Sequence, residues 1–518
     1  MTAYAAFFEE SRVKFADPTA VDRKSGLRLR SETLPAYSTH QAARNGRRAP
    51  RSPVSFWAMP SRRLRNMLPI LFALAAGAAL RLWFIHAFPQ IQGDSLLYAD
   101  IGRNWLTHGI YGRSVIHAGG SQAIAPTLVR LPGYPAFLAL CFAIFGLQNY
   151  LAILYLQVVI DLGTCLLIAA FVRRVCSRRA AMAALWLAVL CPFTANYVAM
   201  PLTETLSIFC VALGIYAFVA VLERPRRRWI LALAFAWSYA ALLRPDGALL
   251  AVVFFLALVF YGRTALGFAR SFRIAVVCGL LSVLPFAVWT LRNWHTFHVF
   301  QPLAPRYATD PGEFNPLGFQ RWTKTWMTDF ASTYEIYWNM PGDDVDIRSF
   351  PSRTFDGPGE YHQTLDLLSQ YNAQDVFTPR IDAGFAALAA QRLRAHPVRY
   401  YVTLPLLRLA DMWLRPRVEM LNIELRWWQY GQHRAETRIA YVYGALNLAY
   451  LLAALTGAFY WPRYRAAMVA YVVLRSLLLL TLEAPEPRYT LECFPIVIAF
   501  AAVALERFRG RSRPSRPV

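Results

Sequence analysis

The chain has 518 residues, of which 56% are hydrophobic and only 16% are charged. Soluble proteins of this length carry a clearly larger charged share, so the composition excludes an ordinary soluble enzyme. Several apolar runs reach the roughly 20 residues that cross a bilayer as a helix, and the alternating strands of a barrel are absent. The sequence therefore predicts an all-α polytopic membrane protein.

The formal net charge of +23 allows two interpretations. A basic protein can bind nucleic acid, but the basic residues here stand in short loops between apolar runs, as they do in the cytoplasmic loops of membrane proteins. We therefore expect no nucleic-acid partner. The seven cysteines lie in or beside apolar runs without metal-ligand spacing, so a disulfide framework is not expected.

The N-terminal part of the chain begins with a polar, basic stretch, residues 1–66, which is expected to form a disordered cytoplasmic tail. A transmembrane catalytic module follows over residues 67–292. Its seven predicted spans are 67–88, 150–172, 180–197, 202–222, 229–243, 247–261 and 273–291.

The apolar stretch 133–146 is too short to cross a bilayer and suits an interfacial helix within the first outer loop, 89–149. This choice follows from the charges. When 133–146 stays on the outer side, every arginine-rich loop falls on the cytoplasmic side.

The second half of the chain is more polar. Residues 293–397 are acidic, contain several tryptophans and turn signals, and are expected to form a small soluble domain on the outer face. Residues 398–437 are expected to lie along the outer interface. Residues 438–506 hold the C-terminal spans, and 507–518 form a basic cytoplasmic tail. The prediction is about ten transmembrane helices, or twelve if both 133–146 and 398–414 cross.

The predicted topology gathers acids and arginines at the outer ends of the helices. Asp94 follows the first span directly, and a carboxylate at that depth is costly without a partner or a function. The other charged residues at this face are Asp100, Glu204, Arg244, Asp246, Arg292, Glu486 and Arg488. Such a gathering indicates a site for an anionic headgroup combined with acid–base chemistry.

Five motifs occur along the chain in a distinctive order. They are Gly93-Asp94 with Tyr98, Ala99 and Gly109; RLPGYPAFLA at 130–139; LTETL at 202–206; RPD at 244–246; and PRY at 487–489. Their order and shared sidedness resemble the integral-membrane glycosyltransferases of the GT-C type, in the branch of protein mannosyltransferases and aminoarabinose transferases. The resemblance covers about residues 67–505 and is weakest in the outer segment.

The resemblance implies a reaction and its substrates. A sugar would pass from a polyprenyl-phosphate donor to a hydroxyl of an acceptor protein, lipid or glycan, with inversion of the anomeric configuration. Asp94 matches the first-loop acid of the family and would be the general base. Arg488, Arg244 and Arg292 would bind the donor phosphate. Further candidates for the site are Asp100, Glu204, Asp246, Tyr98 and Tyr489.

Metal dependence stays open. His295 and His298 have a spacing that permits metal binding on a helix, but no third ligand accompanies them, and no metal site is assigned. Gln92 stands where some relatives carry the second acid of a D-x-D pair. No cofactor is predicted beyond this open question of a divalent metal.

The main alternative is a transporter or flippase of lipid-linked glycans. Transporters tend to show internal repeats and broken helices near the middle of the membrane, whereas the polar residues here gather at one face. A non-catalytic scaffold would leave that gathering unexplained. The expected location is the inner (plasma) membrane, with several spans and an active site that faces the periplasm or outside.

Overall fold

The computed structural model describes residues 62–116, 120–340, 342, 344–374, 376–429 and 432–511. Most of the predicted N-terminal tail and the end of the predicted C-terminal tail lie outside these residues. The chain divides into two compact units, Met1–Pro69 and Ile70–Val518. Of the first unit, only the start of a helix is described.

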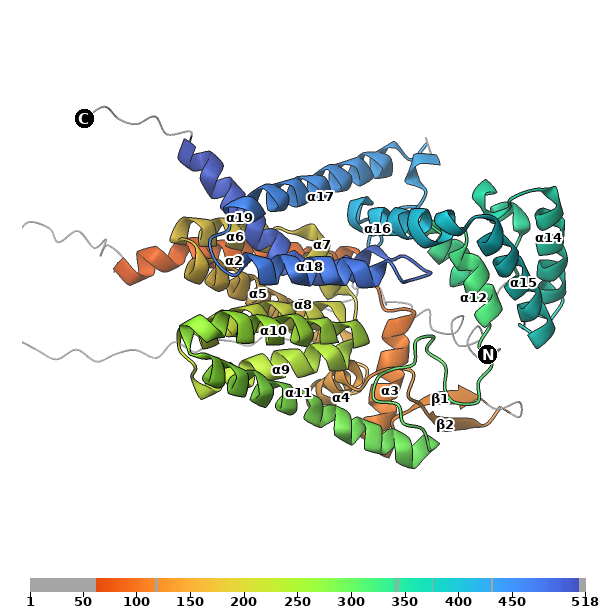
Figure 1. Ribbon diagram of the computed structural model, residues 1–518, viewed down its shortest axis with the longest axis horizontal. Coiled ribbons are helices and arrows are strands. Elements are labelled where there is room, and N and C mark those ends of the chain that lie inside the picture. The colour runs from red at the N-terminus through yellow and green to blue at the C-terminus, as the bar shows by residue number, and fades with distance from the viewer. Residues whose placement is uncertain are drawn as a thin grey trace, which may run out of the picture. The chain divides into compact units, whose positions relative to one another are not determined.

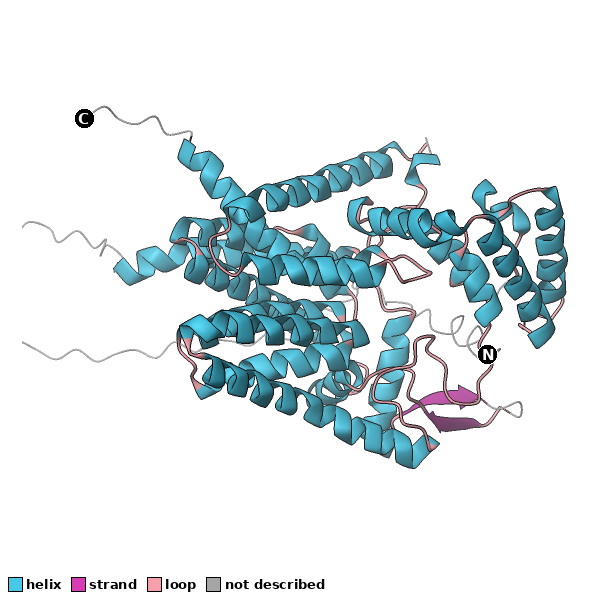
Figure 2. Ribbon diagram, in the orientation of Figure 1, coloured by secondary structure: helices cyan, strands magenta, loops and turns pink. Residues whose placement is uncertain are grey.

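The described residues are almost entirely helical (Figures 1 and 2). Helices occupy every predicted span: α2 (Arg62–Ala87), α5 (Tyr150–Val175), α6 (Arg178–Val189) with α7 (Pro192–Ala195), α8 (Glu204–Glu223), α9 (Arg227–Leu243), α10 (Ala248–Ala265), α11 (Phe268–Phe297), α17 (Arg434–Tyr460), α18 (Arg465–Leu479) and α19 (Phe494–Arg511). Six helices of the described part are long and apolar enough to cross a membrane, and a bent pair makes a seventh. The prediction of an all-α polytopic membrane protein is confirmed.

The remaining predicted spans are formed by short helices. The α9 and α18 helices have 17 and 15 residues, at or below the lower limit of about 17 residues for a spanning helix. The α19 helix ends in the charged residues that follow Leu505. The stretch 133–146 forms the short apolar helix α4 (Gly133–Phe145), as predicted.

The predicted span 180–197 is not one continuous helix. The α6 helix ends at Val189, and the chain resumes in α7 and the 3-10 turn η1 (Asn196–Ala199) after a bend of 49°. Pro192 explains the break, because proline lacks a backbone N–H and its ring clashes with the preceding helical turn. The expectation of a straight helix is corrected accordingly.

Arg81 of α2 binds the carbonyl group that this break leaves free. Its Nη1 donates to the Val189 carbonyl at 2.8 Å and to the Gly77 carbonyl at 2.9 Å. Its Nε donates to Oδ2 of Asp161 on α5 at 2.6 Å. Arg81 is fully buried and Asp161 is 1% exposed, so one buried ion pair joins three helices.

We expect Asp161→Asn to lower the free energy of unfolding by about 3–5 kcal/mol, because it leaves the buried Arg81 guanidinium without a counterion. The measurement is the unfolding of the purified protein in SDS titrations. The double variant Arg81→Met/Asp161→Leu removes both charges and should be more stable than Asp161→Asn. An equal or larger loss in the double variant would contradict the role of the uncompensated charge.

The first outer loop contains two helices and a hairpin. The helices are α3 (Asp94–His108) and α4, and the position of α4 at the membrane interface stays a prediction. Between them, β1 (Gly112–Ile116) and β2 (Gln122–Pro126) pair antiparallel, with Gly112 opposite Pro126 and Ile116 opposite Gln122. This hairpin was not expected from the sequence.

The polar segment between α11 and α17 has a core of its own. Its main helices are α12 (Leu317–Lys324), α13 (Phe330–Ser332), α14 (Pro358–Asn372), α15 (Pro379–Ala395) and α16 (Leu404–Leu414), with a π-helical turn, η3 (Thr333–Tyr337), after α13. Trp322, Trp326, Tyr371 and Phe385 are buried together in this core. The aromatic side chains that the sequence placed in this segment therefore form its packing centre.

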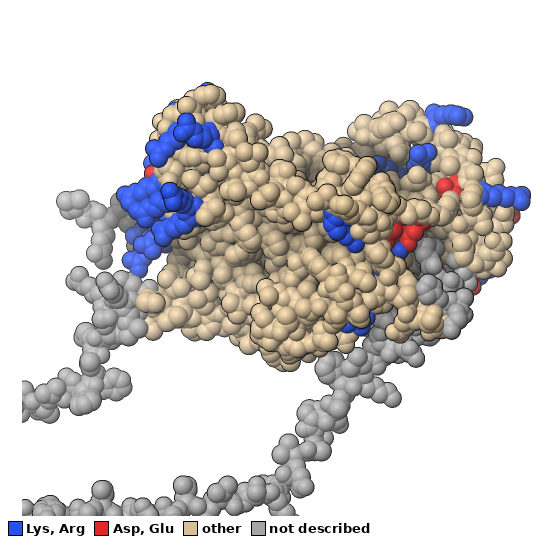
Figure 3. Space-filling model, turned by 90° about the horizontal axis from the view of Figure 1, so that it is seen from below, with Lys and Arg blue, Asp and Glu red and all other residues tan. Residues whose placement is uncertain are grey.

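Basic side chains gather at one end of the helical bundle (Figure 3). The α8 helix begins at Glu204 and ends at Glu223, directly before the basic run 224–228. The α9 helix begins in that run and ends directly before Arg244. Glu204 and Arg244 therefore lie at the end of these helices that is opposite the basic run.

Candidate functional site

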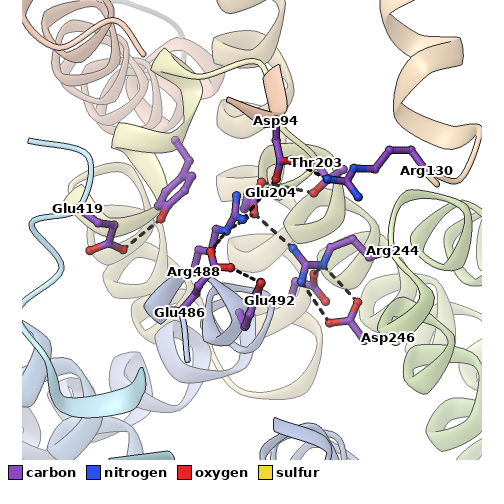
Figure 4. Close-up of polar contacts among 12 residues, drawn as sticks. Asp94, Arg130, Thr203, Glu204, Arg244, Asp246, Glu419, Glu486, Arg488 and Glu492 are labelled. Carbon is purple, nitrogen blue, oxygen red and sulfur yellow. Dashed lines mark hydrogen bonds and ion pairs between the residues drawn. The ribbon is translucent and has the colours of Figure 1, made fainter. Parts of the chain in front are cut away.

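A network of ion pairs joins separate segments at this opposite end of the bundle (Figure 4). Its members come from the start of α3, the loop before α4 and the start of α8. Others come from Arg244 and the 3-10 turn η2 (Pro245–Gly247) after α9, from the α18 helix, and from Glu486 and the 3-10 turn η8 (Pro487–Cys493) before α19. The acids are Asp94, Glu204, Asp246, Glu486 and Glu492, and the arginines are Arg130, Arg244, Arg475 and Arg488.

Asp94 is the first residue of α3. Gly93 before it has φ 57° and ψ −126°, a conformation that residues with a Cβ rarely adopt, and this glycine turns the chain into the helix. Oδ1 of Asp94 accepts a hydrogen bond from Nη2 of Arg130 at 2.6 Å, and Oδ2 accepts one from Nη2 of Arg488 at 3.5 Å. The Asp94 side chain is still 34% exposed, so a ligand can reach it.

The two arginines decide the ionisation of Asp94. Burial alone raises the pKa of this carboxyl, but the charges of Arg130 and Arg488 outweigh burial and lower the pKa to about 2. Asp94 is therefore an ionised carboxylate at neutral pH, and its basicity is held down by its partners.

Arg488 links Asp94 to the second carboxylate of the site. It lies in η8, where its Nε contacts Glu486 and lies 3.7 Å from Oε1 of Glu204. The η8 turn that carries Arg488 is fixed by Arg417, which is 1% exposed. Arg417 donates a hydrogen bond from Nη1 to the Pro487 carbonyl at 2.8 Å. Arg488 is thus positioned by the backbone of η8 while its guanidinium stays 16% exposed.

Arg244 occupies a similar position on the other side of Glu204. Its Nη1 lies 3.3 Å from Oε1 of Glu204 and its Nε 3.2 Å from Oδ1 of Asp246. Arg475 of α18 is fully buried and holds Asp246 at 2.9 Å and Glu492 at 2.6 Å. The Arg475 charge therefore fixes the carboxylates that in turn orient Arg244.

Both tyrosines predicted for the site lie against these arginines. The Arg130 guanidinium carbon is 5.6 Å from the centre of the Tyr98 ring. The guanidinium carbons of Arg244 and Arg488 are 4.8 Å and 5.6 Å from the centre of the Tyr489 ring. An aromatic face attracts a cation without cancelling its charge, so these arginines remain able to bind an anion.

Asp100 makes a different set of contacts, within the first outer loop. Its Oδ2 accepts from the Ser114 backbone N–H at 2.6 Å, and its Oδ1 accepts from the Ser114 hydroxyl at 2.8 Å and from Nη2 of Arg103 at 2.7 Å. These bonds attach the β1 strand to α3. Its role in the site stays a prediction, and its contacts are those of a residue that anchors the hairpin.

Arg292 also contacts the hairpin region. Its Nη2 donates to the Tyr111 carbonyl at 2.7 Å and its Nη1 donates to the Thr127 carbonyl at 2.8 Å. Both terminal nitrogens are thus engaged by backbone oxygens, and binding a phosphate would require them to leave these partners. The predicted phosphate contact of Arg292 stays a prediction.

Four members of this site were not assigned from the sequence. Arg130 stands in one of the quoted motifs, but its pairing with Asp94 could not be read from spacing. Arg475 was the clearest missed signal, because a lone arginine inside an apolar run is costly unless it is paired. Glu492 and Arg417 gave no comparable pattern.

A metal site is not evident in the described part of the chain. No group of three or more His, Cys, Asp or Glu side chains there is arranged to hold a metal ion. The carboxylates of the network are engaged by arginines.

A comparison with protein-family models identifies one match. Residues 127–289 match the model described as dolichyl-phosphate-mannose-protein mannosyltransferase. Residues 127–289 are thus similar to these mannosyltransferases. The matched residues include Arg130, Glu204, Arg244 and Asp246, so four members of the ion-pair network lie within the family match. The predicted relationship to GT-C type glycosyltransferases is confirmed.

Solved structures show a more distant similarity, and no curated protein matches the sequence. An oligosaccharyltransferase from Archaeoglobus fulgidus, tethered to an acceptor peptide, has 11% identity and a TM-score of 0.47, over 86% of this chain and 50% of that one. ArnT from Cupriavidus metallidurans, bound to undecaprenyl phosphate, has 16% identity and a TM-score of 0.37, over 87% of this chain and 79% of that one. The chain thus spans about half the length of the archaeal enzyme.

Proposed function

We propose that this protein is a membrane glycosyltransferase that moves a sugar from a polyprenyl-phosphate donor to an acceptor hydroxyl. The observation that carries the proposal is the contact between Asp94 and Arg488, which lie 394 residues apart in the chain. This contact places a carboxylate that can take a proton beside a guanidinium that can hold a phosphate. The family match, whose description contains a polyprenyl-phosphate sugar, supports the same reaction.

The donor phosphate binds to Arg488 and Arg244 in this proposal. Both guanidiniums are partly exposed, at 16% and 17%, and both share the carboxylate of Glu204. A phosphate group accepts the same charge-assisted hydrogen bonds as a carboxylate, so it can replace Glu204 as their partner. The two arginines then stabilise the charge that grows on the phosphate as the sugar departs.

The chemical step is a single displacement. The acceptor hydroxyl oxygen forms a bond to the anomeric carbon while the bond from that carbon to the phosphate oxygen breaks. The hydroxyl proton passes to Asp94, and the bond electrons leave with the polyprenyl phosphate. Attack from the face opposite the phosphate inverts the anomeric configuration.

Donor binding and base strength are linked in this arrangement. The charge of Arg488 is one of the two causes that lower the pKa of Asp94. The phosphate of the donor is a diester of the polyprenyl chain and the sugar, so it carries one negative charge. When it binds Arg488 it neutralises part of the guanidinium charge, so the pKa of Asp94 rises when the donor is bound. Asp94 thus becomes a stronger base when the sugar is in place.

We further propose that the site faces the periplasm, or the outside, of the inner membrane. The basic loops lie at the other end of the bundle, which would then be the cytoplasmic end. The reaction draws on a lipid-linked donor, so the active site would open next to the lipid bilayer.

The proposal is tested with the purified protein in liposomes that contain a panel of radiolabelled polyprenyl-phosphate sugars. We expect one donor to lose its sugar to a membrane-extract acceptor, with release of polyprenyl phosphate. If every donor keeps its sugar, the proposal fails. If a donor crosses the bilayer with its sugar attached, the flippase alternative replaces it.

A further inference from the structure

A groove of about 430 Å³ lies between the chain that leads into α3 and the loop that precedes α17. It is also lined by residues of the polar segment, at α13 and η3. The polar side chains that matter here are Gln90, Gln92, Glu335, Glu419, Glu424 and Glu436. The aromatic ring of Tyr334, which is 49% exposed, lines it as well.

The groove adjoins the ion-pair network at two points. Gln92 precedes Asp94 by two residues, and its carbonyl accepts the Ser95 N–H at 3.2 Å at the start of α3. Glu419 accepts a hydrogen bond from the Tyr197 hydroxyl at 3.0 Å, and in Figure 4 Glu419 lies to the left of the network, joined by a dashed line to this tyrosine alone. A molecule in the groove therefore lies against the segment that leads into Asp94.

The charge of the groove is negative. Glu335 is balanced by Arg426 at 2.6 Å, and Glu436 lies 3.4 Å from His433, which balances it only when the imidazole is protonated. Glu424 is exposed. Its carboxylate has no ion pair with another described residue, and it adds a negative charge to the groove wall.

Glu419 is the least satisfied of these carboxylates. One of its oxygens accepts from Tyr197, whereas Oε2 is buried and has no hydrogen-bond partner from another residue of the described chain. Burial raises the pKa of this carboxyl above its ordinary value, and the charge of Arg417 and the hydrogen bond from Tyr197 offset this only in part. A buried acceptor of this kind is satisfied when a ligand supplies an N–H or O–H group.

The two sides of the site thus differ in the charge that they favour. Arg488 and Arg244 attract the anionic donor, whereas Glu419 and Glu424 repel it. The donor phosphate is therefore excluded from the groove by the same electrostatics that bind it at Arg488. The groove is left for the other substrate.

We infer that this groove binds the acceptor, and that the acceptor carries a positively charged amine or guanidinium group close to the hydroxyl that receives the sugar. The inference rests on the proposed function. The carboxylates that line the groove attract a cationic acceptor and exclude phosphorylated or acidic acceptors. The ring of Tyr334 supplies a face against which such a cation can pack.

The test is a binding measurement that needs neither donor nor sugar transfer. The full-length protein is placed in nanodiscs of zwitterionic lipid and titrated with a fluorescent peptide in which serine is flanked by lysines. An equivalent peptide with aspartates is the charge-reversed probe. We expect the basic peptide to bind, its affinity to fall with salt, and the acidic peptide to show no saturable binding.

Variants assign the binding to the groove. Glu424→Gln changes an exposed side chain and leaves the fold intact, and the double variant Glu419→Gln/Glu424→Gln is expected to weaken binding of the basic peptide by about tenfold. Asp366→Asn, an exposed acid on α14 outside the groove, is the matched control and should bind like the unchanged protein. Unchanged affinity in the double variant, or equal binding of both peptides, overturns the inference.

Competition identifies the source of the cation. Two competitors are compared, the unlabelled peptide and an oligomer of glucosamine. If only the unlabelled peptide displaces the labelled one, the acceptor is a protein. If the glucosamine oligomer also displaces it, the acceptor is an amine-bearing glycan. Displacement by neither overturns the inference. The binding test and the liposome test of sugar transfer are separate experiments, so their failures can be distinguished. Binding of the basic peptide to the groove without any sugar transfer would count against the proposed function alone. Sugar transfer that is unchanged in the Glu419→Gln/Glu424→Gln variant would count against the groove alone.

Discussion

Asp94→Asn is expected to lower the rate of sugar transfer by about 10²–10⁴-fold, the range that a positioned general base contributes. The amide keeps the size of the side chain and can still accept from Arg130, so the site retains its shape. It cannot take the proton of the acceptor hydroxyl. The measurement is kcat with the polyprenyl-phosphate donor that the purified protein uses, together with the binding of free polyprenyl phosphate.

The control for Asp94→Asn is Asp366→Asn, which removes a carboxylate of the same size far from the network. The two variants should have similar unfolding transitions and very different rates. Undiminished transfer by a folded Asp94→Asn protein would remove the base assignment and direct attention to the other carboxylates of the network, Glu204 first.

The ionisation of Asp94 adds a pH signature to this prediction. Because Arg130 and Arg488 lower the pKa of Asp94 to about 2, the free protein keeps this carboxylate ionised at every pH above about 3. The pH profile of kcat/KM reports the free protein and should show no loss from this group in mildly acid solution. In Arg130→Gln the pKa of Asp94 rises, so the acid limb of the profile should move to higher pH.

Arg488→Gln is expected to lower kcat/KM by about 10²–10³-fold, the range for losing one donor that stabilises charge in a transition state. It should also weaken the binding of free polyprenyl phosphate, because one of the two proposed phosphate ligands is gone. Arg488→Lys keeps the charge but not the planar fork, and should restore part of the loss. Both quantities are measured on the purified protein, by initial rates and by lipid titration.

Arg292→Gln provides the comparison for Arg488→Gln. If Arg292 serves the hairpin through the Tyr111 and Thr127 carbonyls, its loss should lower thermal stability and leave the affinity for polyprenyl phosphate nearly unchanged. Equal weakening of phosphate binding by the two substitutions would place Arg292 among the phosphate ligands, as the family resemblance implies. Unchanged phosphate binding in Arg488→Gln would remove Arg488 from that role.

The sequence by itself determined the membrane character, the helical class and the sidedness of the charges. These properties depend on the length of apolar runs and on the placement of arginines between them, and both are local features. Asp94 and Glu204 could therefore be assigned to the same side of the membrane from the sequence alone, although their ion-pair partners could not. The order of the five motifs identified the family for the same reason.

Only the tertiary structure decided which charges meet. A guanidinium can bind any carboxylate or carbonyl group within reach, and reach is set by packing between segments that are distant in the chain. Thus Arg488 meets Asp94 and Glu204, whereas Arg292, which looked equivalent in sequence, binds the carbonyl groups beside the hairpin. Arg81 and Asp161 lie in two predicted spans that the sequence does not connect. They meet because α2 and α5 pack together, and Arg81 also binds the carbonyl group that the break at Pro192 leaves free.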